Sequence, residues 1–170
     1  MARFVFALCS AALLSACGSS GPPNEAKELA GQLTGDAKGA ASDNELCRLY
    51  TPDELTKYLG RTPGAGENAM MGCQWSATQD SDPDPVFVQM QLTPEAGGMG
   101  ENAVPRGAPE YREVPELGRV GYVARGMANG WDAGAFIGKE WLGVSITGPS
   151  ATDAKAIALF KDVVARRGMK

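Results

Sequence analysis

The segment 86–92 alternates between two kinds of side chain, and this pattern constrains the fold more than any other feature of the chain. One side carries Val86, Val88, Met90 and Leu92, whereas the other carries Phe87, Gln89 and Gln91. A period of two residues is that of a β-strand, whose successive side chains point to opposite faces of a sheet. One apolar side and one largely polar side are typical of an antiparallel sheet that is packed on one face only. The segment therefore predicts a half-buried antiparallel sheet.

Other segments with strand character lie on both sides of this one. Their residues are 72–78, 113–114, 119–124, 133–137 and 141–147, and the stretch 138–140 predicts a short hairpin connection. The polar residues 79–85 predict a loop between the first two strands. The segment 94–109 is rich in glycine and proline and has no period, which predicts a second, longer loop.

A helix is predicted at each end of this group of strands. Thr51 and Glu54 form a capping box at the start of the first helix, and Gly60 ends it. At the other end of the chain, Ser150 and Asp153 form a variant of the capping box before an amphipathic segment. This order of elements predicts an α+β domain, an antiparallel sheet of about five or six strands with N- and C-terminal helices packed on it.

Residues 1–16 predict a secretory signal peptide. Arg3 supplies a positive charge, an apolar run over 4–14 follows, and Ser15 and Ala16 are small. The run is too short to span a bilayer as a permanent helix. Residues 14–17, Leu-Ser-Ala-Cys, resemble the lipobox of bacterial lipoproteins, although a plain secretion signal before a cysteine is the alternative.

The lipobox resemblance implies that Cys17 carries diacylglycerol and acyl chains such as palmitate. The protein would then be held at a membrane of the cell envelope by this anchor. We expect the periplasmic face of the outer membrane in a Gram-negative organism and the outer face of the cytoplasmic membrane otherwise. Residues 17–43, rich in Gly, Ala, Ser and Pro, predict the lipidated cysteine and a flexible tether, and residues 44–170 predict a single domain.

Cysteine usage predicts one disulfide. Cys9 lies in the signal peptide and Cys17 in the lipobox, so Cys47 and Cys73 remain for the domain. A disulfide between them is the leading interpretation for a protein exported to an oxidising space, and two buried free thiols are the alternative. The bond would close a loop of about 27 residues and contribute about 3.5 kcal/mol.

Composition excludes several classes of function. The chain has no histidine, which removes Ser-His-Asp and Cys-His catalysis and histidine-ligated metals. Its formal net charge of −4 argues against a nucleic-acid partner, which usually meets a basic face. The glycine-rich stretches are not followed by Lys-Ser/Thr and do not match phosphate-binding loops. We therefore expect no catalytic residues and no cofactor.

Two features are candidate sites. Asp80, Asp82 and Asp84 have the alternate spacing of a calcium loop, but Pro85 replaces the glycine of that pattern, so a solvated acidic hairpin tip is the preferred interpretation. Trp131 lies in the turn-like stretch 129–132, whereas Trp75 and Trp141 occupy strand positions typical of a core. Trp131 is therefore the candidate binding residue, as an exposed aromatic anchor for a ligand.

The domain also resembles a lipoprotein family of unknown function that is best known from actinobacteria. The resemblance rests on the stretch 45–55, on Tyr58-Leu59-Gly60 and on Gly72-Cys73-Gln74-Trp75, and more weakly on the rest of 44–167. That family starts its first helix after a cysteine, ends it at Leu-Gly and carries a Cys-x-Trp strand. It is similar to the sandwich of helices on an antiparallel sheet seen in a photosystem accessory protein, PsbP. The resemblance implies an envelope address and a fold, but no activity.

Three classes of function fit these observations. The leading hypothesis is a lipid-anchored envelope protein, not an enzyme, that binds an envelope protein or a small ligand. The alternatives are a hydrolase that uses two carboxylates and a structural or assembly subunit of an envelope complex.

Overall fold

Seven strands form one antiparallel sheet in the computed structural model, which describes residues 43–70, 72–95, 101 and 104–169. In chain order the strands are β1 (Glu67–Ala69), β2 (Gly72–Ser76), β3 (Phe87–Pro94), β4 (Arg112–Glu113), β5 (Arg119–Arg125), β6 (Trp131–Ile137) and β7 (Glu140–Thr147). The predicted signal peptide, Cys17 and the predicted tether up to residue 42 lie outside the described residues, so those predictions stay untested.

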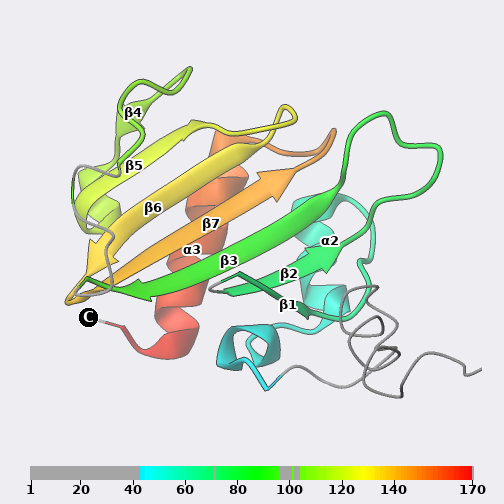
Figure 1. Cartoon of the computed structure of the whole chain (residues 1–170), viewed down its shortest axis with the longest axis horizontal. Coiled ribbons are helices and arrows are strands. Elements are labelled where there is room, and N and C mark those ends of the chain that lie inside the picture. Colours follow the sequence, from blue (N-terminus) through cyan, green and yellow to red (C-terminus); the bar gives the residue numbers. More distant parts are fainter. Residues whose placement is uncertain (1–42, 71, 96–100, 102–103, 170) are drawn as a thin grey trace, which may run out of the picture. The chain divides into compact units, whose positions relative to one another are not determined.

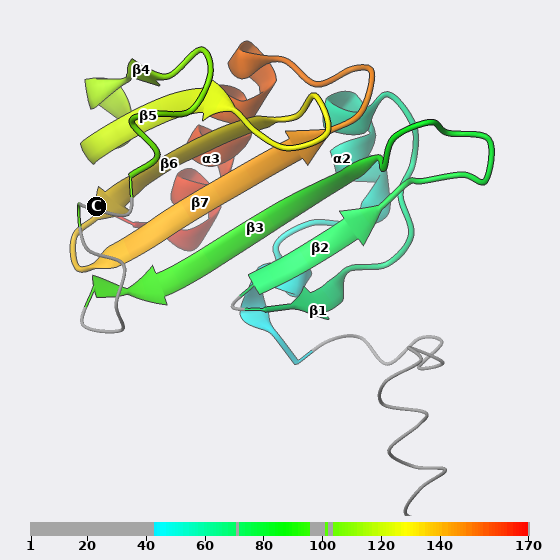
Figure 2. The same cartoon turned by 45° about the horizontal axis from the view of Figure 1, so that its top comes forward.

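The sheet joins two meanders. Its order is β1-β2-β3-β7-β6-β5-β4, so β1 to β3 form one meander, β4 to β7 form the other, and β3 pairs with β7 between them. Figure 2 shows β1 and β4 at the two edges of the sheet. The predicted α+β class and antiparallel sheet are confirmed, but the count of five or six strands was too low by at least one.

Two α-helices cover one face of the sheet. These are α2 (Pro52–Leu59), which packs on β3 and β7, and α3 (Asp153–Arg167), which packs on β5, β6 and β7. Both lie behind the sheet in Figure 1. Two short 3-10 helices complete the described elements, η1 (Glu45–Arg48) before α2 and η4 (Pro115–Leu117) between β4 and β5. The helix-free side of the sheet is called the open face below.

The main core lies between the helices and the sheet. Val88 and Met90 of β3, with their partners Ile146 and Val144 on β7, point toward the helices and are at most 2% exposed. They meet Leu55, Leu59, Leu159 and Phe160 from the two helices, together with Trp75 of β2. The alternation in 86–92 is therefore confirmed, because its apolar side faces this core and Gln89 and Gln91 face away from it.

The helix ends follow the sequence signals in all but one place. At α2, Glu54 accepts a hydrogen bond from the Thr51 backbone N–H at 2.8 Å, and Gly60 ends the helix with a φ of 79°. At α3 the N-cap is Thr152, whose side chain accepts from the Lys155 N–H, and not Ser150. The Ser150 hydroxyl instead donates to the Tyr58 carbonyl, which ties α2 to the start of α3.

The disulfide between Cys47 and Cys73 is present, as predicted. It joins η1 to β2, and the two Cα atoms are 5.3 Å apart. No helix among the described residues has the length and apolar content needed to cross a membrane.

Candidate binding site

The open face is divided into a polar half and an aromatic half. Strand register places Gln74, Gln89, Ser145 and Asp132 in one row across β2, β3, β7 and β6. The next row runs through Gln91, Gly143, Gly134 and Tyr122. Gly143 and Gly134 have no side chain. The centre of the open face therefore lacks side chains of its own between the glutamines on one side and the aromatic rings on the other.

The aromatic half is a small second core on the open face. Tyr122 stacks on both Tyr111 and Trp141 with centroid distances of 5.8 Å, and Phe136 meets Trp141 edge-on at 5.0 Å. Val104 and Ala108 from the segment before β4 pack against these rings. Trp141 is 4% exposed and Phe136 is 2% exposed, so this half of the open face is covered.

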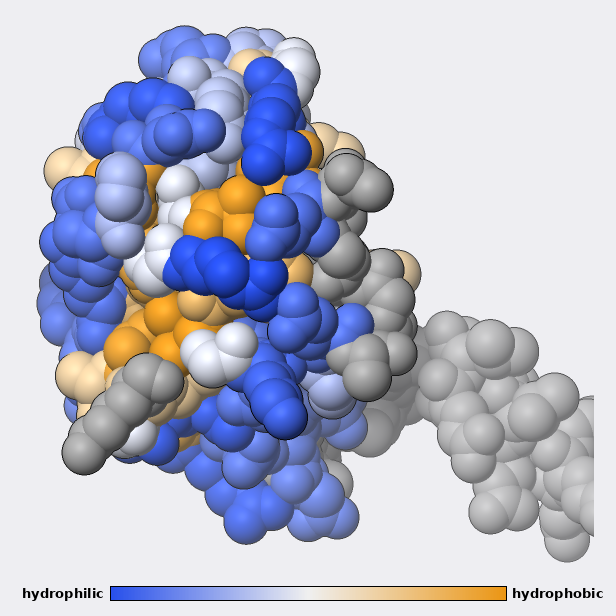
Figure 3. Space-filling view, turned by 90° about the vertical axis from the view of Figure 1, so that its left-hand side faces the viewer, coloured by the Kyte–Doolittle hydropathy of each residue, from blue (hydrophilic) through white to orange (hydrophobic). Residues whose placement is uncertain are grey.

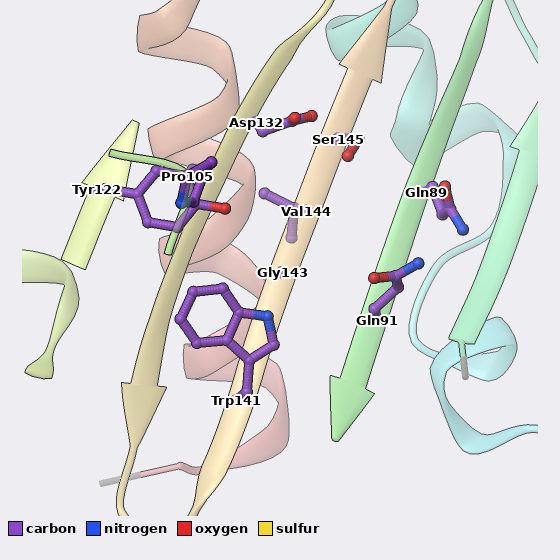
Figure 4. A pocket seen from close by; sticks show the side chains of 10 residues that line it. Gln89, Gln91, Pro105, Tyr122, Asp132, Trp141, Gly143, Val144 and Ser145 are labelled. Carbon is purple, nitrogen blue, oxygen red and sulfur yellow. The ribbon is translucent and has the colours of Figure 1, made fainter. Parts of the chain in front are cut away.

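A pocket of about 170 Å³ lies where the two halves meet. Figure 4 shows Gln89 and Gln91 of β3 on one side of it and Trp141, Tyr122 and Pro105 on the other, with Asp132 and Ser145 toward one end. Gly143 of β7 lies between these two sides. Ten residues line the pocket in all: Gln89, Gln91, Pro105, Tyr122, Asp132, Ala133, Trp141, Gly143, Val144 and Ser145.

Two glycines shape the pocket. A Cβ atom on Gly134 would lie 2.7 Å from the indole of Trp141 and 2.9 Å from the ring of Tyr122. The two rings therefore fill the space that a side chain at this position would take. A Cβ atom on Gly143 would meet only the Trp141 Nε1 atom, at 3.3 Å. The indole thus turns its N–H edge toward the floor of the pocket at Gly143.

The polar groups of the pocket are largely unused by the fold. The carboxamides of Gln89 and Gln91 and the Trp141 N–H make no hydrogen bond within the described part of the chain. Each carboxamide can donate and accept, and the indole N–H can donate. These three groups are therefore free to bind a ligand.

Asp132 is the only charged residue among the ten that line the pocket. Burial raises the pKa of its carboxyl group, and a hydrogen bond from the Ser145 hydroxyl partly opposes this rise in pKa. Among the described residues no Lys or Arg side chain forms an ion pair with this carboxylate. A half-buried acid without a countercharge costs folding free energy and is typical of a functional site.

Asp132→Asn is therefore expected to stabilise the protein at neutral pH. The pKa is higher in the folded state than in the unfolded state, so folding stability falls as pH rises from the unfolded pKa to the folded pKa and stays lower above it. We expect the variant to raise the Tm at pH 7 by about 2–4 °C. Near pH 3, where the carboxyl is protonated in both states, the variant and the wild type should melt together.

Differential scanning calorimetry at both pH values tests this expectation. Asp84→Asn is the control, because Asp84 is an exposed acid outside the pocket. If the Tm of Asp132→Asn at pH 7 were equal to or below that of the wild type, burial of the Asp132 carboxylate would not destabilise the folded state, contrary to this expectation.

The sequence prediction for Trp131 placed it wrongly. Trp131 is the first residue of β6 and not part of the turn before it, and it pairs with Ile146 on the helix side of the sheet. It is half-buried against the main core, and the Arg125 guanidinium lies 4.4 Å from its ring centroid. Trp131 therefore lies on the face opposite the pocket, and its proposed role in binding is tested by none of these contacts.

The acidic tip is organised around an ion pair. The Asp82 carboxylate accepts from Arg61 at 2.7 Å and from the Gln79 backbone N–H at 2.7 Å, and these bonds lower its pKa. Among the described residues no group of three or more acidic, cysteine or histidine side chains could hold a metal ion. Asp80 and Asp84, the other two candidates, are exposed.

Two further hollows offer less chemistry. One of about 320 Å³ lies between loops and is lined mainly by Pro83, Val86, Ala128 and Pro149, and its Asp82 is already paired with Arg61. The other, of about 250 Å³, has Glu113 as its only charged residue. Figure 3 faces the end of the sheet where β3 ends, and there apolar surface is interrupted by hydrophilic side chains. The other polar side chains of the first hollow, Asp84 and Asn129, are exposed, whereas Gln89, Gln91 and Asp132 of the open-face pocket are half-buried.

Sequence reasoning missed the pocket residues. Gln89 and Gln91 were placed on the correct face, and the glycines at 134 and 143 in neighbouring strands were a usable signal for a hollow. The chain matches no protein-family model, no curated protein and no solved structure. The resemblance to an actinobacterial lipoprotein family therefore stays a prediction, and the geometry of the open face carries the functional argument.

Proposed function

We propose that this chain is a lipid-anchored protein of the bacterial cell envelope that binds a small molecule in the open-face pocket and catalyses no reaction. The observation that carries the binding role is the set of unused polar groups around a glycine floor. Buried or half-buried polar groups are normally paired within a fold, so a convergent set without partners favours a ligand.

The lining of the pocket also favours binding over hydrolysis. A glycosidase of the two-carboxylate type needs two acids flanking the bond that it breaks. The pocket has one, Asp132. Its other polar residues are two amides, the hydroxyl groups of Ser145 and Tyr122, and an indole, which orient a ligand through hydrogen bonds and include no second carboxyl group.

The anchoring part of the proposal rests on the lipobox resemblance of residues 14–17. Acyl chains on Cys17 would hold the protein at the membrane, since several chains together give stable attachment where one chain is marginal. The residues between Cys17 and the described domain would serve as a tether. The membrane partner is thus the lipid bilayer itself, and the acidic net charge gives no reason to expect a nucleic acid.

One experiment with two variants tests both parts. Cells producing the wild type, Cys17→Ala or Gly143→Val are labelled with radioactive palmitate and separated into membrane and soluble fractions. The purified proteins are then incubated with small molecules from an envelope extract, and retained compounds are identified by mass spectrometry. We expect Cys17→Ala to lose the label and leave the membrane fraction while keeping its retained compounds. Gly143→Val should keep the label and lose the compounds, because its side chain fills the pocket floor.

The two parts can fail separately. Palmitate on the Cys17→Ala variant would overturn the anchor. Equal retention of compounds by the wild type and Gly143→Val, or no retention by either, would overturn binding in the pocket. The Tm of each variant shows that it is folded, and Gly143→Ala serves as the milder pocket variant if Gly143→Val melts early.

A further inference from the structure

Resting on the proposed binding function, we infer that the pocket takes a neutral, polyhydroxylated ring, which is a sugar residue or a cyclic polyol. The inference depends on four properties of the pocket: its charge, the way it presents its aromatic rings, its mixture of hydrogen-bond donors and acceptors, and its size.

Charge excludes anionic ligands. Phosphate, sulfate and carboxylate groups are bound by Arg, Lys or convergent backbone N–H groups. None of the ten residues that line the pocket is basic, and one of them, Asp132, is an acid. An anionic ligand would lose its hydration and meet a like charge, which is unfavourable.

The aromatic rings offer no free face to a cation, so a cation would be held by Asp132 alone. A cation binds over the face of an aromatic ring, where the charge of the quadrupole is negative. Here the Trp141 and Tyr122 rings lie within 19° of parallel and stack with each other, and Phe136 packs edge-on to Trp141. The part of Trp141 nearest to Gly143 is its N–H edge, which is positive and calls for a hydrogen-bond acceptor.

The remaining chemistry matches hydroxyl groups. Gln89 and Gln91 offer both donors and acceptors, Ser145 offers a hydroxyl, Trp141 a donor and Asp132 an acceptor. Hydroxyl groups both donate and accept, so a ring that carries several of them can satisfy every member of this set. The apolar C–H groups of such a ring can pack on Pro105, which lies beside the Tyr122 ring that already stacks on Tyr111 and Trp141.

The size of the pocket sets the number of rings. Pockets for drug-sized ligands enclose about 300–1,000 Å³, whereas this pocket has about 170 Å³. It therefore takes a single ring, and a dozen non-hydrogen atoms at ordinary ligand efficiency give a Kd in the low millimolar range.

The test is a titration of the detergent-solubilised full protein, followed by saturation-transfer NMR of the added compound. The neutral probes are glucose, mannose, galactose, N-acetylglucosamine and myo-inositol, and the charged probes are glucose 6-phosphate, glucosamine and choline. We expect at least one neutral probe to bind with a low-millimolar Kd and to bind at least tenfold more tightly than its charged counterparts. Gln91→Ala and Gly143→Val should each weaken this binding at least tenfold.

Gln74→Ala is the matched control. Gln74 lies on the open face, in register with Gln89, but outside the pocket lining, so its removal should leave the Kd unchanged. Binding of a sugar that Gln91→Ala and Gly143→Val do not weaken would overturn the inference, because the sugar would then sit elsewhere.

The inference and the proposed function fail in different ways. If a charged probe, or a compound from the envelope extract that is not a neutral sugar or polyol, binds in a manner sensitive to Gly143→Val while no neutral probe does, the sugar inference is wrong and the binding function stands. If no probe binds and no envelope compound is retained, both are wrong.

Discussion

Loss of the Cys47–Cys73 disulfide is expected to lower the free energy of unfolding by about 3.5 kcal/mol. The cysteines are 26 positions apart, so the bond closes a loop that starts within η1, contains α2 and β1 and ends within β2. Without the bond the unfolded chain gains the freedom of that loop, whereas the folded state gains nothing. For a domain of this size the Tm should fall by about 10–15 °C.

The measurement is thermal unfolding of the wild type and of the double variant Cys47→Ser/Cys73→Ser, each with and without dithiothreitol. The reductant should lower the Tm of the wild type toward that of the double variant and leave the double variant unchanged. Cys17→Ala, which keeps the disulfide, should melt as the wild type does. A loss below about 1 kcal/mol would show that the loop is already restricted in the unfolded chain, contrary to the loop-entropy argument.

The sequence predicts the main elements because local chemistry specifies them. Alternation in 86–92 determined which side of β3 is buried, since a strand in an antiparallel sheet has one fixed face toward the core. The capping residues of α2 specified its ends to the residue. The strand that was missed, β1, has three residues, Glu67, Asn68 and Ala69, and none is buried. β1 is a strand only because its backbone pairs with β2, and a hydrophobic pattern in the sequence does not reveal pairing of this kind.

The site was harder to predict because it depends on which face each aromatic residue occupies. Asn129-Gly130 correctly indicated a turn, but β6 begins at Trp131, two residues before the strand expected over 133–137. Within β6, the pairing of Trp131 with Ile146 places its side chain on the helix side of the sheet, which the turn-like local sequence did not indicate. Trp141, expected in the core, is indeed buried, yet its surroundings are the open-face rings and Gly134 rather than the helices. Those neighbours come from separate strands, so only the sheet register reveals the pocket.

Gly72→Ala is expected to be the most damaging single-methyl change in the sheet. A Cβ atom at this position would overlap the Met90 carbonyl oxygen of β3, which belongs to the backbone and cannot rotate away. The added methyl must therefore separate β2 from β3 next to Cys73 and three residues before Trp75, both of which are fully buried.

We expect Gly72→Ala to cost about 3 kcal/mol or more, at or beyond the upper end of ordinary overpacking, because the clash is with backbone and not with a flexible side chain. Chemical unfolding measures this cost. Gly107→Ala is the matched control, since no atom lies within 4 Å of its Cβ position, and it should change stability by less than about 0.5 kcal/mol. If Gly72→Ala were as mild as Gly107→Ala, the close approach of β2 to β3 would not be required. The stretch Gly72-Cys73-Gln74-Trp75 combines a close strand contact, a disulfide and a core tryptophan within β2. The glycine in this stretch would then need an explanation other than close strand contact.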